Sequence, residues 1–212
     1  MVSTHLRPED NQIHHYEALA RIRGTNGEII LPGAFVDTAE TLGLITNIDR
    51  IIIKKTLRTQ SNLCKQGKVL SFSVNLSGKD LEDKEFLEFL KSAITETGVD
   101  PRHLIFEITE TAAVRNLDRA IKFIRELRSV GCRFALDDFG VGFTSFKYLK
   151  EMDVDYIKID GSFIRNLHKT QGDHIFVKAM ADVARGMGIE TIAEFVENGE
   201  IIKILKEYGV DY

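Results

Sequence analysis

The sequence has little cysteine, no long apolar run and no excess of basic residues, and each shortage excludes a class of protein. Its 212 residues include only two cysteines, Cys64 and Cys132. That is too few for a disulfide framework or a zinc knuckle, so we expect a reducing compartment. The N-terminal stretch MVSTHLRPEDNQ lacks the apolar core of a signal peptide. No stretch approaches the ~20 apolar residues that a membrane-spanning helix needs.

The charge and the hydrophobicity are those of a folded domain. Lys and Arg number 28 and Asp and Glu number 32, which leaves a net charge of −4, and 43% of the residues are hydrophobic. These proportions argue against disorder, and the length suits one large domain or two small ones. Because nucleic-acid binders usually carry a basic face, we expect no nucleic-acid partner. An anionic substrate would therefore need a local Arg or Lys, or bound metal cations.

Short β-rich apolar segments alternate with longer amphipathic ones along the whole chain. The predicted strands are Ile13–Arg21, Val69–Asn75, Leu104–Ile108, Arg133–Asp137, Tyr156–Ile159 and Glu190–Ala193. The predicted helices are Pro32–Leu42, Thr46–Gln66, Asp83–Thr97, Asn116–Ser129, Phe146–Glu151, Asp173–Gly188 and Asn198–Tyr208. This alternation predicts an α/β protein with parallel strands and crossover helices, either an open doubly wound sheet or a closed barrel. No glycine-rich phosphate-binding motif follows a strand, which weakens the open nucleotide-binding folds. A barrel usually needs ~250 residues, so here it would be tight or incomplete at an end.

Each predicted strand finishes with a carboxylate, an amide or an amine. In chain order these residues are Glu17, Asn75, Glu107 with Glu110, Asp137 with Asp138, Lys158 with Asp160, and Glu194. A single acid at such a position is usually a helix N-cap or part of a solvated edge. Six strands in a row favour a common site, because the C-terminal ends of barrel strands converge on one face.

This set of side chains predicts a metal site. Several carboxylates close together are costly unless cations neutralise them. Oxygen ligands without His or Cys favour Mg²⁺, Mn²⁺ or Ca²⁺ over zinc. The adjacent pair Asp137-Asp138 can hold two ions with one acid bridging, and ions ~3.5–4 Å apart stabilise the attacking and leaving oxygens of a phosphoryl displacement. The residues themselves therefore favour metal-dependent phosphoester hydrolysis.

Lys158 has two interpretations at this stage. Its apolar neighbours Ile157 and Ile159 indicate that its side chain is desolvated if it enters a barrel. It would then be either a structural ion pair with a nearby acid, or the point charge that orients the nucleophilic water or the phosphate.

Seven ordered motifs resemble those of the EAL domain, the bacterial cyclic di-GMP phosphodiesterase family. They are the run Tyr16-Glu17-Ala18-Leu19-Ala20-Arg21, residues 31–45, Asn75-Leu76-Ser77, Glu107-Ile108-Thr109-Glu110, the loop that starts Asp137-Asp138-Phe139-Gly140, Lys158-Ile159-Asp160, and Ala193-Glu194-Phe195-Val196-Glu197. The resemblance covers nearly the whole chain from Ile13 onward. It implies a modified TIM (β/α)8-type barrel that opens cyclic di-GMP to linear pGpG with Mg²⁺ or Mn²⁺. We also expect inhibition by Ca²⁺, whose looser coordination positions the water less well.

The resemblance also assigns roles to individual residues. Glu17, Asn75, Glu107 and Asp137 look like ligands of one metal, and Asp137, Asp138 and Glu194 look like ligands of a second. Lys158 and Glu194 resemble the groups that position and activate the water. Arg21 resembles the arginine that contacts a substrate phosphate, Leu19 lies against the guanine-side pocket, and Asp160 is placed with the substrate-binding residues. Glu110 resembles the acid that holds the D-D-F-G loop in its active shape.

The same resemblance sets expectations for the wider protein. Residues 1–212 would be a single phosphodiesterase domain, a fragment of a larger signalling protein with an upstream sensory or diguanylate cyclase domain. We expect a homodimer formed through the loop after Asp138, and an output in biofilm formation and motility. We expect the domain to be cytoplasmic, with any membrane anchor of the full-length protein in other segments.

The sequence departs from the family pattern in three places. Arg7 precedes Pro8 where the family has Gln, and the first strand looks abbreviated. The chain ends at Tyr212, before the family's usual Q-G-Y strand and its glutamine. Val141, Phe143, Thr144 and Phe146 replace the usual residues of the loop after Asp138. These departures keep open a second function, a catalytically silent cyclic di-GMP receptor, and a third, a barrel enzyme for another phosphodiester. The full set of acidic residues favours the enzyme.

Overall fold

The computed structural model describes residues 2–6, 13–142 and 146–212. Arg7, Pro8, Phe143 and Thr144, which carry some of the departures from the family pattern, lie outside the described residues. Within the described part of the chain, no helix is both long and apolar enough to cross a membrane.

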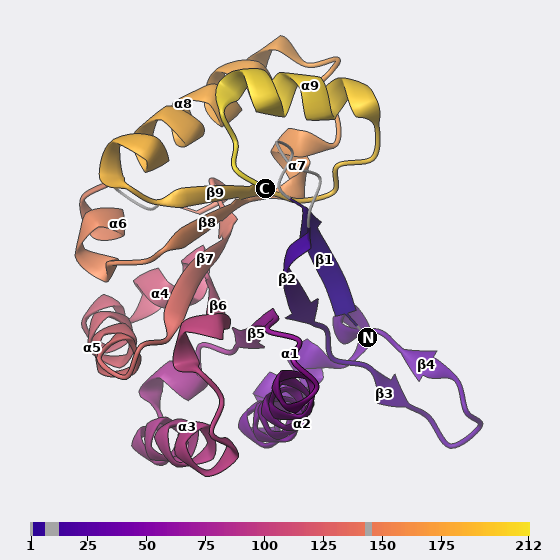
Figure 1. Cartoon of the computed structure of the whole chain (residues 1–212). Helices are drawn as coiled ribbons and strands as arrows, with labels where there is room; N and C mark the ends of the chain where they lie inside the picture. Colours follow the sequence, from indigo (N-terminus) through magenta and orange to yellow (C-terminus); the bar gives the residue numbers. More distant parts are fainter. Residues whose placement is uncertain (1, 7–12, 143–145) are drawn as a thin grey trace.

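One curved sheet of seven strands organises the molecule (Figure 1). Its order is β1-β2-β5-β6-β7-β8-β9, with β1 antiparallel to β2 and every later pair parallel. The strands are β1 (Val2–Leu6), β2 (Ile13–Ala18), β5 (Ser71–Leu76), β6 (Leu104–Thr109), β7 (Arg133–Phe139), β8 (Tyr156–Ile159) and β9 (Glu190–Ala193). The prediction of an α/β fold of the modified TIM-barrel type is confirmed, because the parallel strands curve around a common interior.

Helices follow one another around the outside of this sheet (Figure 1). They are α1 (Val36–Thr41), α2 (Ile45–Lys65), α3 (Lys84–Thr97), α4 (Glu110–Arg115), α5 (Leu117–Arg128), α6 (Phe146–Met152), α7 (Gly161–Ile164), α8 (Gln171–Met187) and α9 (Gly199–Tyr208). Three 3₁₀ turns, Pro32–Ala34, Asp80–Glu82 and Pro101–His103, complete the described elements. Side-chain caps fix several of the helix starts; Asp83 accepts from the amides of Glu85 and Phe86, and Asn198 accepts from those of Glu200 and Ile201.

Most predicted elements lie within a few residues of the observed ones, and the differences have local causes. The predicted helix Pro32–Leu42 is wrong as one element: it is a 3₁₀ turn followed by α1, because Phe35 between them has φ −135° and ψ −22°. The strand predicted to reach Arg21 ends at Ala18. The short hairpin of β3 (Ile22–Arg23) and β4 (Ile29–Ile30) follows it, and neither strand carries an extended apolar pattern. The first strand, expected to be abbreviated, is β1, which pairs with β2 over its length.

The end of the chain lies beside β9. The Tyr212 amide donates to the carbonyl of Thr191, and the Ala193 amide donates to the carbonyl of Tyr212. The Tyr212 ring packs against His15 and Tyr156 at centroid distances of 5.7 and 6.3 Å. The last residues therefore continue the curve of the sheet toward β2 and help to fill the interior at the N-terminal ends of the strands.

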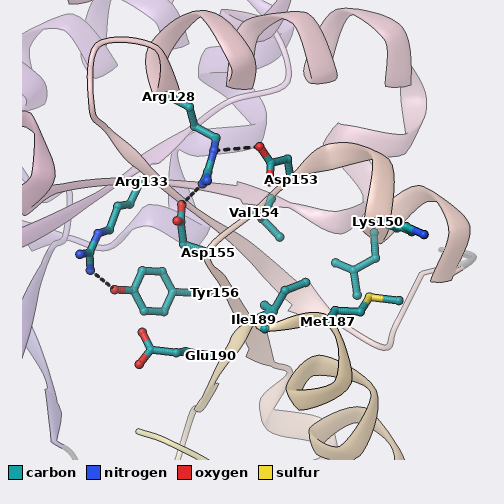
Figure 2. A pocket seen from close by; sticks show the side chains of 12 residues that line it. Arg128, Arg133, Lys150, Asp153, Val154, Asp155, Tyr156, Met187, Ile189 and Glu190 are labelled. Atoms are coloured by element: carbon teal, nitrogen blue, oxygen red, sulfur yellow. Dashed lines mark hydrogen bonds and ion pairs between the residues drawn. The ribbon is translucent and has the colours of Figure 1, made fainter.

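A hollow of about 550 Å³ lies at the N-terminal ends of β8 and β9 (Figure 2). Arg128 pairs there with Asp155, and its Nε lies 3.1 Å from Asp153. Arg133 donates to the Tyr156 hydroxyl at 2.8 Å. Because Arg128 and Arg133 already have partners within the fold, we interpret the side chains around this hollow as a structural network between α5 and β8.

Candidate active site

The interior of the sheet has two layers of side chains that follow the two-residue period of the strands. The lower layer is largely apolar and contains Ile105, Ala135, Tyr156 and Ile192, which form one buried cluster. Two residues further along the chain from each of these stand Glu107, Asp137 and Lys158 on their strands, and Glu194 directly after β9. The pleat therefore turns these four side chains toward one point above a closed apolar floor. Glu17 on β2 and Asn75 on β5 extend this upper layer.

Lys158 stands at the centre of the layer. Its Nζ lies 2.8 Å from Glu107, 2.8 Å from Glu194 and 3.2 Å from Asp137. Glu17 is further away, at 3.9 Å, and Lys158 itself is 1% exposed. Burial works against the charged ammonium, but the surrounding carboxylates outweigh it and raise the pKa of Lys158 well above its ordinary value. Lys158 is therefore charged and paired with several acids at once, as the ion-pair interpretation of the sequence expected.

Glu107 is the most deeply buried of the acids. Its side chain is fully buried, and burial is the largest cause that raises its pKa to about 7. One carboxylate oxygen accepts from Lys158 at 2.8 Å. Within the described residues, the other oxygen, Oε1, has no hydrogen-bond partner although it is closed to solvent. An unpaired carboxylate oxygen in such a place is costly unless a cation contacts it.

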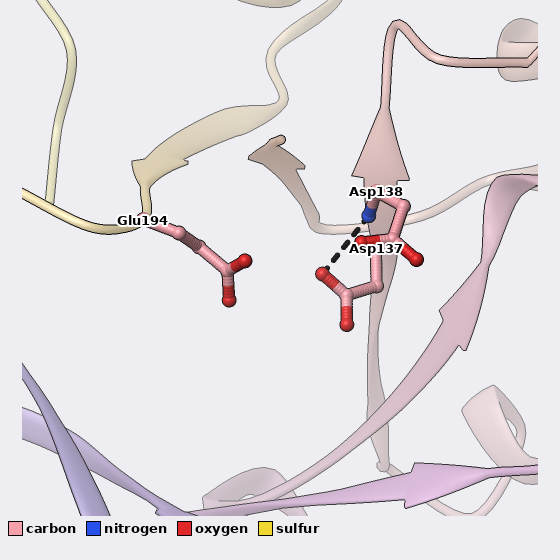
Figure 3. A group of neighbouring side chains, drawn as sticks. All are labelled: Asp137, Asp138 and Glu194. Atoms are coloured by element: carbon pink, nitrogen blue, oxygen red, sulfur yellow. Dashed lines mark hydrogen bonds between the residues drawn. The ribbon is translucent and has the colours of Figure 1, made fainter. Parts of the chain in front are cut away.

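Asp137, Asp138 and Glu194 form a second group at the rim of the layer (Figure 3). Each contributes a carboxylate oxygen, and these oxygens lie within 4.8 Å of one another, which fits a shared metal ion. Asp138 has a left-handed backbone, φ 53°, and its amide donates to the carboxylate of Asp137 at 2.9 Å. Burial, followed by the charge of Asp137, raises the pKa of Asp138 to about 6. Burial also raises the pKa of Glu194.

The side-chain amide of Asn75 on β5 contacts Glu17 on β2 within the upper layer. Its Nδ2 donates to Oε1 of Glu17 at 2.7 Å, while Oε2 of Glu17 faces Lys158. The structure thus brings six of the predicted site residues into one cluster of side chains, and Asp138 joins it at the rim. The cluster holds carboxylate and amide oxygens with no thiol or imidazole among its described members, which is a donor set that fits Mg²⁺ or Mn²⁺.

Three predicted substrate-binding residues lie around this cluster. Asp160 directly follows β8, caps α7 by accepting from the Ser162 amide at 2.8 Å, and contributes to the raised pKa of Asp138. Leu19 and Arg21 follow β2 at the end that carries Glu17. The Nη1 of Arg21 donates to the neighbouring carbonyl of Ala20 at 2.6 Å, so its guanidinium is folded back on its own backbone here.

Glu110 contacts the loop that follows β7. Its Oε2 accepts from the amides of Gly140 at 2.9 Å and Gly142 at 3.4 Å. A side chain at position 142 would place its Cβ 2.5 Å from Oε1 of Glu110, so the carboxylate would have to move if this glycine were replaced. The carboxylate joins the start of α4 to the segment that directly follows the two aspartates.

Two structural features were missed by the sequence analysis. Asp49 on α2 is hydrogen-bonded to Asp80, and burial followed by that contact raises the pKa of Asp49 to about 9. The second is Phe195, which follows Glu194, has φ 54° and is 51% exposed. Asp49 carried no signal in the sequence because its partner lies in another element. Phe195 stood inside a recognised motif, but nothing in the one-dimensional pattern gives its backbone conformation.

The family model and the curated relatives that match this chain agree with one another. The family model described as the EAL domain matches residues 6–212. The chain is 42% identical over 196 residues to the cyclic di-GMP phosphodiesterase PdeB of Shewanella oneidensis, covering 92% of this chain and 23% of PdeB. It is 33% identical over 196 residues to the cyclic di-GMP phosphodiesterase PdeA of Borreliella burgdorferi, covering 92% of this chain and 29% of PdeA. The chain thus spans about a quarter of the length of these relatives.

Solved structures match over nearly the whole chain. The PaMucR phosphodiesterase in complex with c-di-GMP superposes with a TM-score of 0.94 at 27% identity, over 99% of this chain and 85% of that one. The EAL domain of FimX from Pseudomonas aeruginosa, bound to c-di-GMP, superposes with a TM-score of 0.91 at 26% identity, over 100% of this chain and 85% of that one.

Proposed function

The chain belongs to the EAL domain family, and on that premise we propose that it hydrolyses cyclic di-GMP to linear pGpG in a reaction that depends on Mg²⁺ or Mn²⁺. The relatives named as cyclic di-GMP phosphodiesterases and the neighbour solved with c-di-GMP support this substrate. The residues that would perform the reaction are those of the upper layer and its rim.

The charge of the cluster is the observation that carries the proposal. Five carboxylates, from Glu17, Glu107, Asp137, Asp138 and Glu194, surround the single ammonium of Lys158. If all five are ionised, four negative charges stay unbalanced, and two divalent cations would balance them. Burial is the largest cause of the raised pKa values of Glu107 and Asp138, and the neighbouring acids add to it, so without cations the cluster favours protons.

The geometry suggests two adjoining ligand sets. Glu17, Asn75, Glu107 and Asp137 would hold one ion, with the unpaired Oε1 of Glu107 as a ready ligand. Asp137, Asp138 and Glu194 would hold the second, so Asp137 is shared. When bound, such ions acidify water and neutralise the charge of the phosphate.

Lys158 and Glu194 would position and activate the nucleophilic water. Glu194 lies at the rim with its pKa raised, so it can accept the proton that the water loses. Lys158, fixed by several acids, can donate a hydrogen bond that holds the water or the phosphate in place. Attack by the water oxygen on one phosphorus and cleavage of one P–O ester bond open the ring and give pGpG.

Substrate contacts would come from the loops around the cluster. Arg21 has to leave its contact with the Ala20 carbonyl to bind a phosphate through its planar fork. Leu19 would lie against a guanine, and Asp160 would border the site beside Asp138. Glu110 would keep the loop after Asp138 in its active shape, and the same loop would contribute to a homodimer.

The domain would act within a larger signalling protein. We propose that residues 1–212 form one phosphodiesterase domain, that an upstream sensory or diguanylate cyclase domain controls it, and that the reaction lowers the level of the second messenger in the cytoplasm. Biofilm formation and motility are the outputs expected of such a change.

A panel of metal ions tests this function. The protein is freed of metal with a chelator and then given cyclic di-GMP with Mn²⁺, Mg²⁺, Ca²⁺ or no ion, and the products are separated by chromatography. Conversion to pGpG with Mn²⁺ or Mg²⁺, little with Ca²⁺ and none with chelator is the expected pattern. Tight binding without turnover under every condition would instead identify a receptor, and equal rates with Ca²⁺ and Mg²⁺ would contradict the assigned coordination.

A further inference from the structure

One face of α2 is basic. The helix contains a single acid, Asp49, and five basic residues, which are Arg50, Lys54, Lys55, Arg58 and Lys65. Asp49 is buried, so it adds no negative charge to the exposed side of the helix. The chain as a whole has a net charge of −4. The basic face of α2 therefore contrasts with the rest of the molecule, which is more acidic than the total charge indicates.

Most of the exposed residues of α2 form one stripe along the helix. They are Asn47, Ile51, Lys54, Lys55, Arg58, Asn62 and Lys65. At ~100° per residue they lie within about a third of the helix circumference. The buried residues Ile53, Leu57 and Gln60 point the other way, and the helix packs against α3 and β5. The stripe therefore faces away from the body of the protein and holds no acidic residue.

Three cations of this stripe have no ion-pair partner within the part of the chain that the structure describes. Lys55, Arg58 and Lys65 are all exposed. Lys54 lies over the ring of Phe89, with its Nζ 5.3 Å from the centroid. Like charges on one face repel one another, and a surface of opposite charge relieves that repulsion. The stripe is thus complementary to an anionic surface.

Apolar side chains accompany the cations at the N-terminal end of the stripe. Ile51 is 55% exposed, and Leu44, directly before α2, is 49% exposed. Leu42, in the turn between α1 and α2, is 65% exposed. A nucleic acid offers phosphates to the cations but no apolar layer to these side chains. The boundary between headgroups and acyl chains of a membrane offers both.

We propose that this stripe, with Leu42 and Leu44, is a docking surface for anionic phospholipids at the face of a membrane. A helix of 21 residues presents an edge of about 30 Å to such a plane. Each Lys or Arg close to an anionic membrane strengthens binding about fivefold, so the four cations of the stripe together supply on the order of 10²- to 10³-fold. The inference goes beyond the proposed function, because none of these residues belongs to the acidic cluster.

Sedimentation with lipid vesicles tests the proposal. The protein is mixed at low salt with vesicles of phosphatidylcholine, either alone or with about one-third phosphatidylglycerol. We expect wild type to sediment with the anionic vesicles only, and to be released as KCl is raised, because salt screens the attraction. The triple variant Lys55→Gln, Arg58→Gln, Lys65→Gln should bind the anionic vesicles about 100-fold more weakly.

A matched variant removes the same charge from the other side of the molecule. In Figure 1, α8 and α9 lie at the top and α2 at the bottom. Lys178 on α8 and Lys203 and Lys206 on α9 are exposed. Their combined replacement by glutamine should leave vesicle binding at the wild-type level. Thermal unfolding and hydrolysis of dissolved cyclic di-GMP should be unchanged in both triple variants, because all six positions lie on the surface and outside the acidic cluster.

Tryptophan fluorescence reports whether the apolar end of the stripe enters the lipid. The chain contains no tryptophan, so Ile51→Trp carries the single indole. Its emission should shift to shorter wavelength when anionic vesicles are added. Ile202→Trp, at a 40% exposed position on α9, is the control and should not respond.

The outcomes separate lipid docking from the alternatives. Wild type that does not sediment with anionic vesicles overturns the proposal, and so does equal binding by wild type and the α2 triple variant. If duplex DNA or polyglutamate binds wild type as tightly as the vesicles do, and Ile51→Trp shows no shift with vesicles, the stripe is a site for another polyanion and the proposal is wrong. Failure of wild type to hydrolyse cyclic di-GMP would contradict the proposed function but would leave each of these expectations unchanged.

Discussion

Lys158 and Glu107 form an ion pair of 2.8 Å that is closed to solvent on both sides, with exposures of 1% and 0%. Neither residue could be buried alone, since a lone charge in the interior is far more costly than a paired one. Lys158 serves several acids at the same time, so the charge balance of the whole upper layer depends on this one ammonium when no metal is bound.

Replacement of Lys158 by methionine should therefore destabilise the metal-free protein. We expect Lys158→Met to lower the free energy of unfolding in chelator by about 3–5 kcal/mol, the usual cost of leaving a buried charge without its partner. Because the acids then lack a cation, Mn²⁺ should raise the melting temperature more in the variant than in wild type. Thermal unfolding with chelator and with Mn²⁺ measures both effects.

A surface lysine provides the control for this change. Lys178 pairs with Asp182 at 3.2 Å on α8 and is 56% exposed. Lys178→Met should change the stability by less than about 1 kcal/mol and should not alter the response to Mn²⁺. Equal stability of Lys158→Met and wild type in chelator would contradict the central place given to Lys158.

Loss of the Glu110 carboxylate should loosen the loop after β7. Glu110→Ala removes the acceptor of the Gly140 and Gly142 amides, and because the loop follows two proposed metal ligands, we expect turnover to fall about 10- to 100-fold. Glu110→Gln keeps one acceptor oxygen, so its turnover should lie between those of wild type and Glu110→Ala. Hydrogen exchange of the peptide that contains Gly140 should become faster in Glu110→Ala. Unchanged exchange would show that this contact does not hold the loop.

Asp49 should make the stability of the protein depend on pH. Its pKa is raised from 3.8 to about 9 in the folded protein, first by burial and then by its hydrogen bond to Asp80. The folded state thus binds this proton more tightly than the unfolded chain, so the stabilisation is complete below pH ~4 and is lost as the pH rises toward ~9. Ser77 and Glu40 are the other groups that act on this carboxyl.

Asp49→Asn should remove this dependence, because the amide stays neutral at every pH and can donate to Asp80. We expect the variant to be more stable than wild type at pH ~8, by on the order of 1–3 kcal/mol, and nearly equal to it at pH ~5. Denaturant unfolding at several pH values measures the difference. Parallel curves for the two proteins would show that Asp49 does not titrate in this range.

The sequence was most informative where the strand period and the chemistry coincide. Glu107, Asp137, Lys158 and Glu194 each stand at a strand end, and a shared face follows from parallel topology, so their convergence could be expected. The contacts of Lys158 with several acids could not be expected from the sequence, because such contacts depend on the stagger between strands. The Asp49–Asp80 contact and the stacking of Arg165 on Phe195 join different elements and leave no periodic signal. The β3–β4 hairpin was missed because its strands of two residues are too short to show a pattern.

The most direct test of the account compares wild type with Asp137→Asn, because Asp137 is the one residue assigned to both ligand sets. Conversion of cyclic di-GMP to pGpG is followed at saturating Mn²⁺, with bound manganese measured in both proteins and folding checked by thermal unfolding. The account predicts that wild type binds two ions and turns over, and that Asp137→Asn binds fewer ions and is slower by on the order of 10³-fold. A folded Asp137→Asn protein that hydrolyses cyclic di-GMP at the wild-type rate would contradict it.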